Sequence, residues 1–494
     1  MSDVTFVDTT LRDGNQSLWA FNMKTAAMLE AIERMDRAGF ESMEFFTATM
    51  FKKYVREHKE NPWHWLREGA RRARNTPLRL HGGIKGGLEK KPTSVSRLVV
   101  QHVVDSGITH TRTSNPWNDY SVFKEDVEAL RDAGMNCSVN LIYSVSPRHT
   151  DEYYARKARE AAALKPWRIC FKDVGGLLTP ERTRTLVPIV LENIGDIPVE
   201  FHAHCNNGLA PLNYLEAIEL GMTTIHTGVP PLANGSAQPS VFNMARNVRA
   251  MGHTVAVDEE VLKPVQEHFN FVAKRDGLPV GAPRAFDQSV YNHQVPGGMI
   301  ANFVHQLRLV GMEDKLPAAL EEAARVRAEW GYPIMVTPLS QFVGTQAAIN
   351  IIMGERYKQV TDQSIQYAHG IWGREGAELM DPDVKDRILG RPRARDWEGW
   401  QQPDPSLLEV RTQLGSSSMS DEELILRVFA GDEALEELQN AGRPREYLSA
   451  SQPLVRLVNE LTKQQEYTHV YIRKPGFSLT LGRSGDGETA EGAA

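Results

Sequence analysis

The chain has 494 residues, a formal net charge of −7 at pH 7 and an ordinary globular composition, with 41% hydrophobic and 24% charged residues. This charge offers no basic footprint for nucleic acid or an anionic membrane, and no apolar stretch reaches the about 20 residues that a membrane-spanning helix needs. Three cysteines are too few for a disulfide framework, and the N-terminus has no signal-peptide pattern, so we expect a cytoplasmic protein of two or three domains.

Residues 4 to about 250 repeat one pattern, in which a short β-rich run is followed by an amphipathic helical stretch. The predicted strands are Val4–Thr10, Ser42–Ala48, Leu78–Ile84, Ile108–Ser114, Cys137–Ser144, Arg168–Val174, Pro198–Cys205 and Thr223–Val229. The predicted helices between them include Lys24–Ala38, Thr93–Ser106, Tyr120–Ala133, Thr150–Ala163, Thr179–Asn193 and Leu212–Leu220. Glycines that follow helices, such as Gly39 and Gly134, are typical helix stops.

Strands that alternate with helices pair in parallel, and eight such units predict an α/β fold, the closed (β/α)₈ or TIM barrel. A doubly wound open sheet is the alternative. It would need a glycine-rich phosphate loop after an early strand, and Gly82–Gly87 matches that motif poorly.

The seventh predicted strand ends in two histidines. Alternate side chains of a strand point to the same side, so His202 and His204 project together. Neutral imidazoles are good ligands for a divalent transition metal. Because a His-x-His pair also occurs often without a metal, the prediction of a metal site depends on further ligands from neighbouring strand ends.

Polar residues do gather at the carboxyl ends of other predicted strands, where the active site of such a barrel lies. They are Asp8 to Gln16 at the end of strand one, Arg112 in strand four, Lys172 and Asp173 at the end of strand six, and Ser236 after strand eight. Each has a purely structural alternative: Asp8 could cap a turn, Lys172 could pair with an acid, and Ser236 could be a helix N-cap. The gathering of all of them on one rim favours an active site.

Helical patterns dominate the second half of the chain. We expect the barrel at residues 1–255, an α-helical domain capping its mouth at 256–412, and a small C-terminal segment at 419–483 that docks a carrier or partner. The predicted helices include Glu259–Arg275, Gly298–Val310, Leu316–Trp330, Thr345–Met353 and Asp421–Asn440. The C-terminal segment should end in a hairpin turned at Pro475-Gly476, and the tail 484–494 should be disordered.

Several of these stretches carry motifs that are specific in combination. They are Asp8-Thr9-Thr10-Leu11-Arg12-Asp13, Phe171-Lys172-Asp173 with Gly176-Leu177-Leu178-Thr179-Pro180, His202-Ala203-His204-Cys205, and Pro296-Gly297-Gly298-Met299 with Thr337–Gln346 and Met353–Lys358. Over about residues 3 to 480 the chain resembles the biotin-dependent carboxyltransferases: the transferase domain of pyruvate carboxylase, transcarboxylase and the oxaloacetate decarboxylase α subunit.

The resemblance implies a divalent metal (zinc, manganese or cobalt) held by Asp13, Lys172, His202 and His204. An ammonium group has no lone pair for a metal, and in this family the lysine is carbamylated by CO₂, which gives it a carboxylate-like oxygen. The metal then polarises the substrate carbonyl and stabilises an enolate oxygen.

The resemblance also implies the reaction, in which CO₂ moves between carboxybiotin and an enolisable acceptor such as pyruvate or oxaloacetate. Catalytic roles fall to Ser236, Arg12, Gln16 and Lys172. Ser236 stands where the family has a threonine that shuttles a proton between biotin and acceptor. The residues expected to contact the substrate are Arg112, Lys85 and Gln16.

The chain departs from the family pattern around this pocket. After strand three the family has Arg-Gly-Gln-Asn, whose arginine helps to hold the keto acid, and this chain has Gly83-Ile84-Lys85-Gly86. Lys85 offers a point charge in place of a bidentate fork. His226 stands in strand eight where an aspartate is usual. These departures leave the identity of the acceptor open.

The sequence contains no Met-Lys-Met biotinylation motif, so biotin is expected on a separate carrier protein that a biotin carboxylase subunit charges. We also expect a homo-oligomer that acts on a small carboxylic acid. Two other functions stay open at this stage: a biotin-independent metal-dependent lyase or aldolase of the same barrel type, and a non-catalytic assembly subunit.

Overall fold

The structure is a computed structural model that describes residues 2–84, 91–295, 300, 303–304, 307–415, 418–442, 457–458, 460–461, 469–474 and 477–482. The chain divides into two compact units, residues 1–445 and 446–494. The first unit contains every element up to α21, and the second contains a hairpin. None of the described helices has the length and apolar character needed to cross a lipid bilayer.

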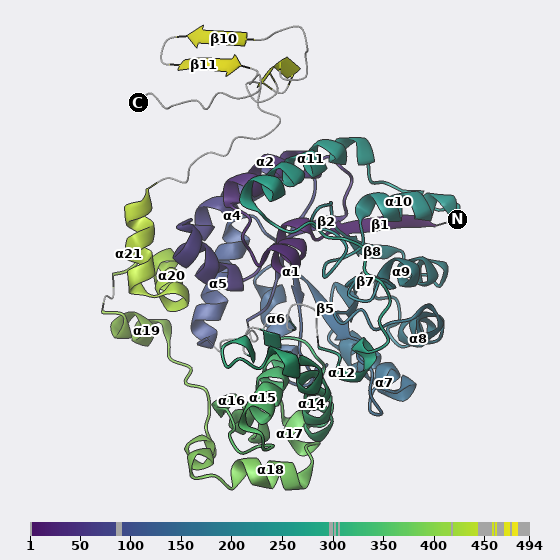
Figure 1. The fold of residues 1–494 in the computed structure, drawn as a ribbon, viewed down its shortest axis with the longest axis vertical. Helices are drawn as coiled ribbons and strands as arrows, with labels where there is room; N and C mark the ends of the chain where they lie inside the picture. Colours follow the sequence, from purple (N-terminus) through teal and green to yellow (C-terminus); the bar gives the residue numbers. More distant parts are fainter. Residues whose placement is uncertain are drawn as a thin grey trace. The chain divides into compact units, whose positions relative to one another are not determined.

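Eight parallel strands form the centre of the first unit (Figure 1). They are β1 (Asp3–Asp8), β2 (Ser42–Phe46), β3 (Leu78–His81), β4 (His110–Thr113), β5 (Asn136–Ile142), β6 (Arg168–Asp173), β7 (Val199–Ala203) and β8 (Thr224–Thr227). Neighbours in sequence are neighbours in the sheet, and β1 pairs with both β2 and β8, which closes the barrel. The predicted TIM barrel is confirmed, with each strand somewhat shorter than its sequence pattern.

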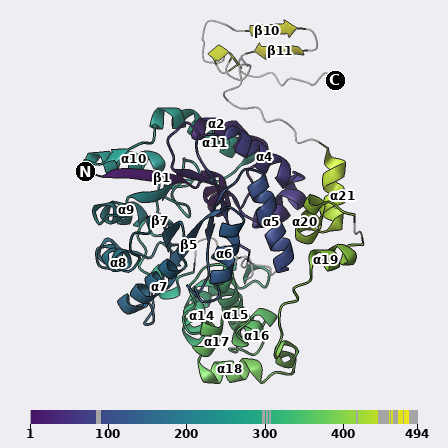
Figure 2. The same ribbon diagram turned by 180° about the vertical axis from the view of Figure 1, so that it is seen from behind.

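Helices surround the strands on the outside of the barrel (Figure 2). The main ones are α2 (Thr25–Met35), α4 (Pro62–Arg72), α5 (Thr93–Asp105), α6 (Lys124–Asp132), α7 (Asp151–Ala163), α8 (Pro180–Glu192), α9 (Ala210–Glu219) and α10 (Val241–Ala250). The side chains of Thr150 and Thr179 cap the backbone amides that open α7 and α8. The predicted glycine stops are found, since Gly39 and Gly134 have φ values of +84° and +88°.

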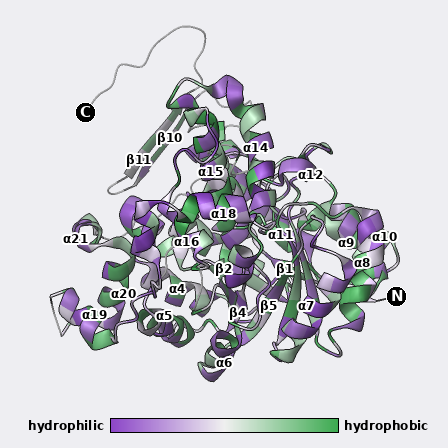
Figure 3. Ribbon diagram, turned by 90° about the horizontal axis from the view of Figure 1, so that it is seen from below, coloured by the Kyte–Doolittle hydropathy of each residue, from purple (hydrophilic) through white to green (hydrophobic). Residues whose placement is uncertain are grey.

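The strands are buried on both faces, and hydrophobic residues are concentrated along them in Figure 3. The inside of the barrel is nevertheless rich in charge. Arg79, Arg112, Glu44 and Glu200 are fully buried there and pair with one another or with nearby polar groups. On each strand these charged residues are flanked by apolar residues. Together they form a layer of paired charges inside the barrel, below the carboxyl ends of the strands.

A ninth strand and a long helix follow the barrel. β9 (Thr254–Val255) pairs with the start of β1, and α11 (Glu259–Asp276) packs on α2. Leu262, Val265 and Phe269 of α11 belong to the barrel's hydrophobic core. The helix therefore extends the barrel beyond residue 255, the boundary expected from the sequence.

The helical region has a core of its own, visible as a separate cluster of helices in Figure 1. Its elements are α12 (Val290–His293), η3 (Glu313–Lys315), α14 (Leu316–Glu329), α15 (Leu339–Met353), α16 (Asp362–Ala368), α17 (Arg374–Glu378), α18 (Pro382–Leu389) and η4 (Pro392–Trp397). It is joined to the barrel by polar contacts: Arg327 donates to Ser144 Oγ and to the Val145 carbonyl, each at 3.0 Å. Arg148 forms an ion pair with Glu375.

The next helices return to the barrel: α19 (Leu407–Gln413), α20 (Asp421–Ala430) and α21 (Asp432–Ala441). α20 and α21 pack against α3 (Thr49–Lys53), η2 (Tyr54–His58) and α5, and Leu424, Ile425 and Leu435 join the barrel core. The helical piece expected over Asp421–Asn440 is found as two helices that meet at Gly431, whose φ is +88°. Residues 419–442 thus belong to the compact unit that holds the barrel, and the boundary lies between residues 445 and 446.

In the second unit, β10 (His469–Lys474) and β11 (Phe477–Gly482) form the antiparallel hairpin that the sequence predicts. The proposed turn at Pro475-Gly476, the tail 484–494, and the loop residues Lys85 and Pro296–Met299 lie outside the described residues.

Candidate functional site

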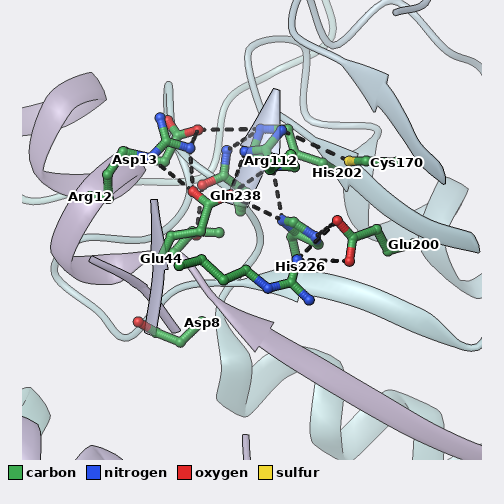
Figure 4. Close-up of polar contacts among 12 residues, drawn as sticks. Asp8, Arg12, Asp13, Glu44, Arg112, Cys170, Glu200, His202, His226 and Gln238 are labelled. Atoms are coloured by element: carbon green, nitrogen blue, oxygen red, sulfur yellow. Dashed lines mark hydrogen bonds and ion pairs between the residues drawn. The ribbon is translucent and has the colours of Figure 1, made fainter. Parts of the chain in front are cut away.

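Asp13, His202 and His204 come together at the carboxyl end of the barrel (Figure 4 labels Asp13 and His202). Asp13 lies on η1 (Thr10–Gly14), a short helical turn directly after β1, and the two histidines lie at the end of β7. His202 Nε2 is 3.2 Å from His204 Nε2 and 3.3 Å from Asp13 Oδ2, and His204 Nε2 is 3.7 Å from the same oxygen. All three side chains are buried.

These separations fit one metal ion. Two nitrogens that each lie about 2.0–2.1 Å from a common ion are roughly 2.8–3.4 Å apart, with the shorter separations in octahedral and the longer ones in tetrahedral geometry. Burial lowers the pKa of both His202 and His204, so both imidazoles are neutral ligands near pH 7. His204 Nδ1 lies 2.6 Å from the Ser236 carbonyl, which can only accept a hydrogen bond, so its Nε2 is left unprotonated and faces the cluster.

Asp13 is held as a carboxylate. Burial alone raises its pKa, but the Arg12 guanidinium and the two histidines outweigh burial and hold the pKa of Asp13 well below its usual value. Arg12 Nη2 donates to Asp13 Oδ2 at 2.9 Å, and the Ser17 hydroxyl donates to Asp13 Oδ1 at 2.7 Å. The carboxylate is therefore charged and fixed in orientation.

Lys172 lies beside this cluster. It is paired in register with His202 across β6 and β7, and its side chain is buried. Among the described residues it forms no ion pair, although Asp13 is near enough to favour its charged form. Burial, followed by repulsion from Arg112, lowers the pKa of Lys172 to about 7. A large fraction of this lysine is thus an uncharged, nucleophilic amine at neutral pH.

Glu44 on β2 is a central residue of the site that sequence reasoning missed. It accepts from Arg12 Nε at 2.8 Å and from Arg112 Nε at 2.7 Å, and both guanidinium groups make a second bond to it. Burial disfavours the charge on Glu44, but Arg112 and Arg12 overcome this effect and hold its pKa well below the usual value. Both arginines predicted at the rim are therefore already paired with a buried acid.

The other predicted site residues lie around this network. Arg112 also donates to Asn140 Oδ1 at 3.2 Å, and Arg12 Nη1 donates to Gln16 Oε1 at 3.3 Å. The Ser236 hydroxyl donates to the Ser17 carbonyl at 2.7 Å. The backbone carbonyl of Ser236 is the hydrogen-bond partner of His204 Nδ1. Ser236 is no helix cap, because α10 begins at Val241. The position of Lys85 is outside the described residues.

Two aspartates of the rim have structural bonds. Asp8 accepts from the hydroxyl and the amide of Thr10, and Asp173 accepts from the amides of Leu177 and Leu178. Burial raises the pKa of Asp8 to about 7 and that of Asp173 to about 6. Asp8 thus fixes the turn that positions Asp13, which is the turn-capping role that the sequence allowed.

Sequence reasoning also missed two residues of the site, Glu200 and Gln238, and the contacts that His226 makes. Glu200 could have been found, because the alternation of a strand puts residues 200, 202 and 204 on one side. Gln238 donates to His202 Nε2 at 3.3 Å, and Thr9 donates to Gln238 Oε1 at 2.7 Å. No local pattern marks a glutamine in a loop as the neighbour of a histidine 36 residues away.

A closed parallel barrel with buried acid, imidazole and amine groups at the carboxyl ends of its strands defines a TIM-barrel enzyme with a candidate metal centre. Comparison with known protein families gives two matches: the HMGL-like family over residues 3–268 and the conserved carboxylase domain over residues 290–473.

Individual relatives agree. The chain is 34% identical over 391 residues to a pyruvate carboxylase subunit of Methanocaldococcus jannaschii, covering 78% of this chain and 68% of that protein. It is 29% identical over 436 residues to the 2-oxoglutarate carboxylase large subunit of Hydrogenobacter thermophilus, covering 86% and 67%. The carboxyl transferase domain of Rhizobium etli pyruvate carboxylase, solved with pyruvate and biocytin, has the same fold, with a TM-score of 0.78, 21% identity and coverage of 89% and 77%.

The chain therefore belongs to the family of biotin-dependent carboxyltransferases, as its motifs predicted. It is an enzyme of this class, and the comparisons do not favour a biotin-independent lyase. Membership of the family implies biotin and a divalent metal as cofactors and a multi-subunit enzyme.

Proposed function

We propose that this chain is the carboxyltransferase subunit of a biotin-dependent carboxylase that acts on a small 2-oxo acid. It would exchange a carboxyl group between carboxybiotin, carried on a separate protein, and the enolisable carbon of the acid. The observation that carries the proposal is the buried cluster of Asp13, His202 and His204 with the low-pKa Lys172 beside it. Zinc, manganese or cobalt suits these ligands.

In this proposal Asp13, His202, His204 and a carbamylated Lys172 hold the metal. When bound, the metal supplies Lewis-acid polarisation of the acceptor carbonyl. The chain's own groups do the rest. Arg12, fixed by Asp13 and Glu44, donates a hydrogen bond to the exposed Gln16 and so holds its side chain beside the cluster. The fully buried Glu44 keeps Arg112 in place and so maintains positive charge beneath the acceptor.

The Ser236 hydroxyl is the proposed proton carrier between biotin and acceptor. The backbone carbonyl of Ser236 orients His204, which places the hydroxyl near the cluster, and a hydroxyl can both donate and accept a proton. We expect Ser236→Ala to lower carboxyl transfer by about 10²-fold, the low end for a positioned proton-transfer group, and Ser236→Thr to be tolerated. Steady-state rates of both variants measure this, with metal content unchanged in each.

The control for Ser236 is Ser240→Ala, on the same loop ahead of α10, whose side chain makes no cap bond. This variant should keep wild-type turnover. A Ser236→Ala enzyme with near-normal turnover and a lowered melting temperature would assign the hydroxyl a structural role only.

A panel of acceptors tests the proposed function. The full chain is incubated with free carboxybiotin, or with a carboxylated biotin carrier protein, and with pyruvate or 2-oxoglutarate, the acids in its relatives' names. We expect carboxybiotin to be consumed in step with one of these 2-oxo acids and not with the matching 2-hydroxy acid, which cannot form an enolate. Turnover of a 2-oxo acid without any biotin would contradict the proposal and support a lyase.

The same proposal predicts a biotin carboxyl carrier protein and a biotin carboxylase subunit as partners. Avidin capture from the native source should recover this chain with a biotinylated protein. Recovery of the chain without any biotinylated protein would remove the carrier from the proposal.

A further inference from the structure

His226 of β8 lies directly beneath His202 in the barrel interior (Figure 4). The two Nδ1 atoms are 3.0 Å apart, the rings are nearly perpendicular at 88°, and neither side chain is exposed. Two ring nitrogens at this distance share one hydrogen, because a hydrogen bond needs one donor and one acceptor. Which ring carries that hydrogen is decided by what each ring faces on its other side.

His202 faces the metal cluster with its Nε2, which lies 3.2 Å from His204 Nε2 and 3.3 Å from Asp13 Oδ2. The Gln238 amide nitrogen also approaches this Nε2, at 3.3 Å, as a donor would. Nε2 must be unprotonated to bind a metal, so the hydrogen of neutral His202 is on Nδ1. His226 Nδ1 is then the acceptor.

The groups on the opposite side of the His226 ring favour the same tautomer, in which Nδ1 is the acceptor. Its Nε2 faces Glu200 Oε1 at 3.5 Å, and Arg79 Nη1 holds the Glu200 carboxylate at 3.0 and 2.8 Å. A carboxylate held by a guanidinium attracts an N–H and repels a lone pair, so the hydrogen of His226 is on Nε2. Arg79 is in turn held by the half-buried Glu41 at 2.8 Å.

Glu44 is the other polar group near His226 Nδ1, and it would accept a hydrogen from that nitrogen if His226 carried one there. Its Oε1 is 4.0 Å from His226 Nδ1, and Arg12 and Arg112 already occupy the carboxylate. Glu44 therefore does not compete for the ring, and His226 is the side chain in hydrogen-bond contact with His202 Nδ1.

We propose that His226 is a positioning residue for the metal: it accepts the Nδ1 hydrogen of His202 and so aims the Nε2 lone pair into the Asp13–His202–His204 cluster. Glu200 and Arg79 hold His226 in the tautomer that this requires. The proposal rests on the proposed metal site, and it assigns a function to a histidine outside the Asp13–His202–His204 cluster. Residues that orient a metal ligand change metal affinity about 10–100-fold when they are lost.

The test compares two substitutions in the full chain. His226→Leu fills the space but has no acceptor, and His226→Asn keeps an oxygen acceptor. Zn²⁺ affinity is measured by competition with a chromophoric chelator. We expect His226→Leu to weaken Zn²⁺ binding 10–100-fold and to speed its release, and His226→Asn to remain within about threefold of wild type.

A buried histidine away from the site provides the control. His268 on α11 contacts the Ala27 carbonyl at 2.8 Å, and His268→Leu should leave Zn²⁺ affinity unchanged. If His226→Leu does not fold, His226→Val, which also has no acceptor, takes its place. Unchanged affinity in the acceptor-free variant, or equal losses in it and in His226→Asn, would overturn the proposal. Failure of the wild-type chain to bind Zn²⁺, Mn²⁺ or Co²⁺ would instead reject the proposed metal site itself.

Discussion

The double variant His202→Ala/His204→Ala should contain no stoichiometric divalent metal and should transfer no carboxyl group. The substitution removes two of the three candidate ligands that lie within 4.8 Å of one another, and it leaves Asp13 with Arg12 as its partner. Asp13, already paired with a guanidinium, and Lys172 offer no imidazole and make a poor site for a transition metal. Elemental analysis of the purified protein measures the loss directly.

Thermal melts give a second measurement of the same prediction. A metal that binds only the folded state stabilises it by about 4 kcal/mol at a thousandfold excess over its Kd. Added Zn²⁺ should therefore raise the melting temperature of the wild-type protein after metal removal and leave that of the double variant unchanged. The matched control is His149→Ala/His268→Ala, two buried histidines outside the cluster. Stoichiometric metal in the cluster variant would show that these histidines are not the ligands.

The fold was predictable because its signals are local. Each strand is a short β-rich run, and the helices between them begin and end at residues such as Thr150 and Gly134 that fix the backbone by themselves. The closed barrel follows from the number of repeats. Strand β8 proves shorter than predicted because an apolar residue continues into a loop that packs on the barrel, as Val229 does after β8.

The gathering of polar residues at the rim was predictable for a related reason, because barrel strands place their carboxyl ends on one rim. The choice of Asp13, Lys172 and the two histidines as metal ligands came from the family resemblance and stays a prediction, and the structure places Asp13, His202 and His204 within 4.8 Å of one another. The charged residues below the rim, such as Glu44, could not be predicted in this way. Glu44 is 32 residues from Arg12 and 68 from Arg112, and it lies in an apolar run that indicates only a buried strand. The return of α20 and α21 onto the barrel likewise depends on distant contacts, such as that of Arg56 with the Ala430 carbonyl.

Lys172→Ala should abolish carboxyl transfer, and in wild-type protein Lys172 should carry a carbamate. The uncharged amine attacks CO₂, a new N–C bond forms, and one proton is released to solvent, which leaves an anionic oxygen ligand. With its pKa near 7, about 90% of Lys172 is uncharged at pH 8, whereas an ordinary lysine is under about 1% uncharged. The barrel thus selects this lysine for a reaction that surface lysines rarely undergo.

Incubation of metal-free protein with ¹³CO₂ tests this selection. The wild type should show one carbamate resonance that Lys172→Ala lacks, and it should bind Zn²⁺ more tightly with CO₂ present than after degassing. The variant should bind Zn²⁺ weakly under both conditions. Because a protonated amine cannot attack CO₂, the carbamate of the metal-free protein should decline as the pH falls through about 7, the pKa of Lys172.

Lys157 is the control that shows whether burial alone is enough for a lysine to be carbamylated. It and Lys172 are the two buried lysines among the described residues, but Lys157 lies on α7 and forms an ion pair with Glu160 at 3.1 Å, whereas Lys172 forms none there. Lys157→Ala should keep the carbamate resonance, the CO₂-dependent metal affinity and the activity. Zn²⁺ binding that is equally tight with and without CO₂ in the wild type would mean that Lys172 is no carbamylated ligand, and that Asp13 and the two histidines hold the metal without it.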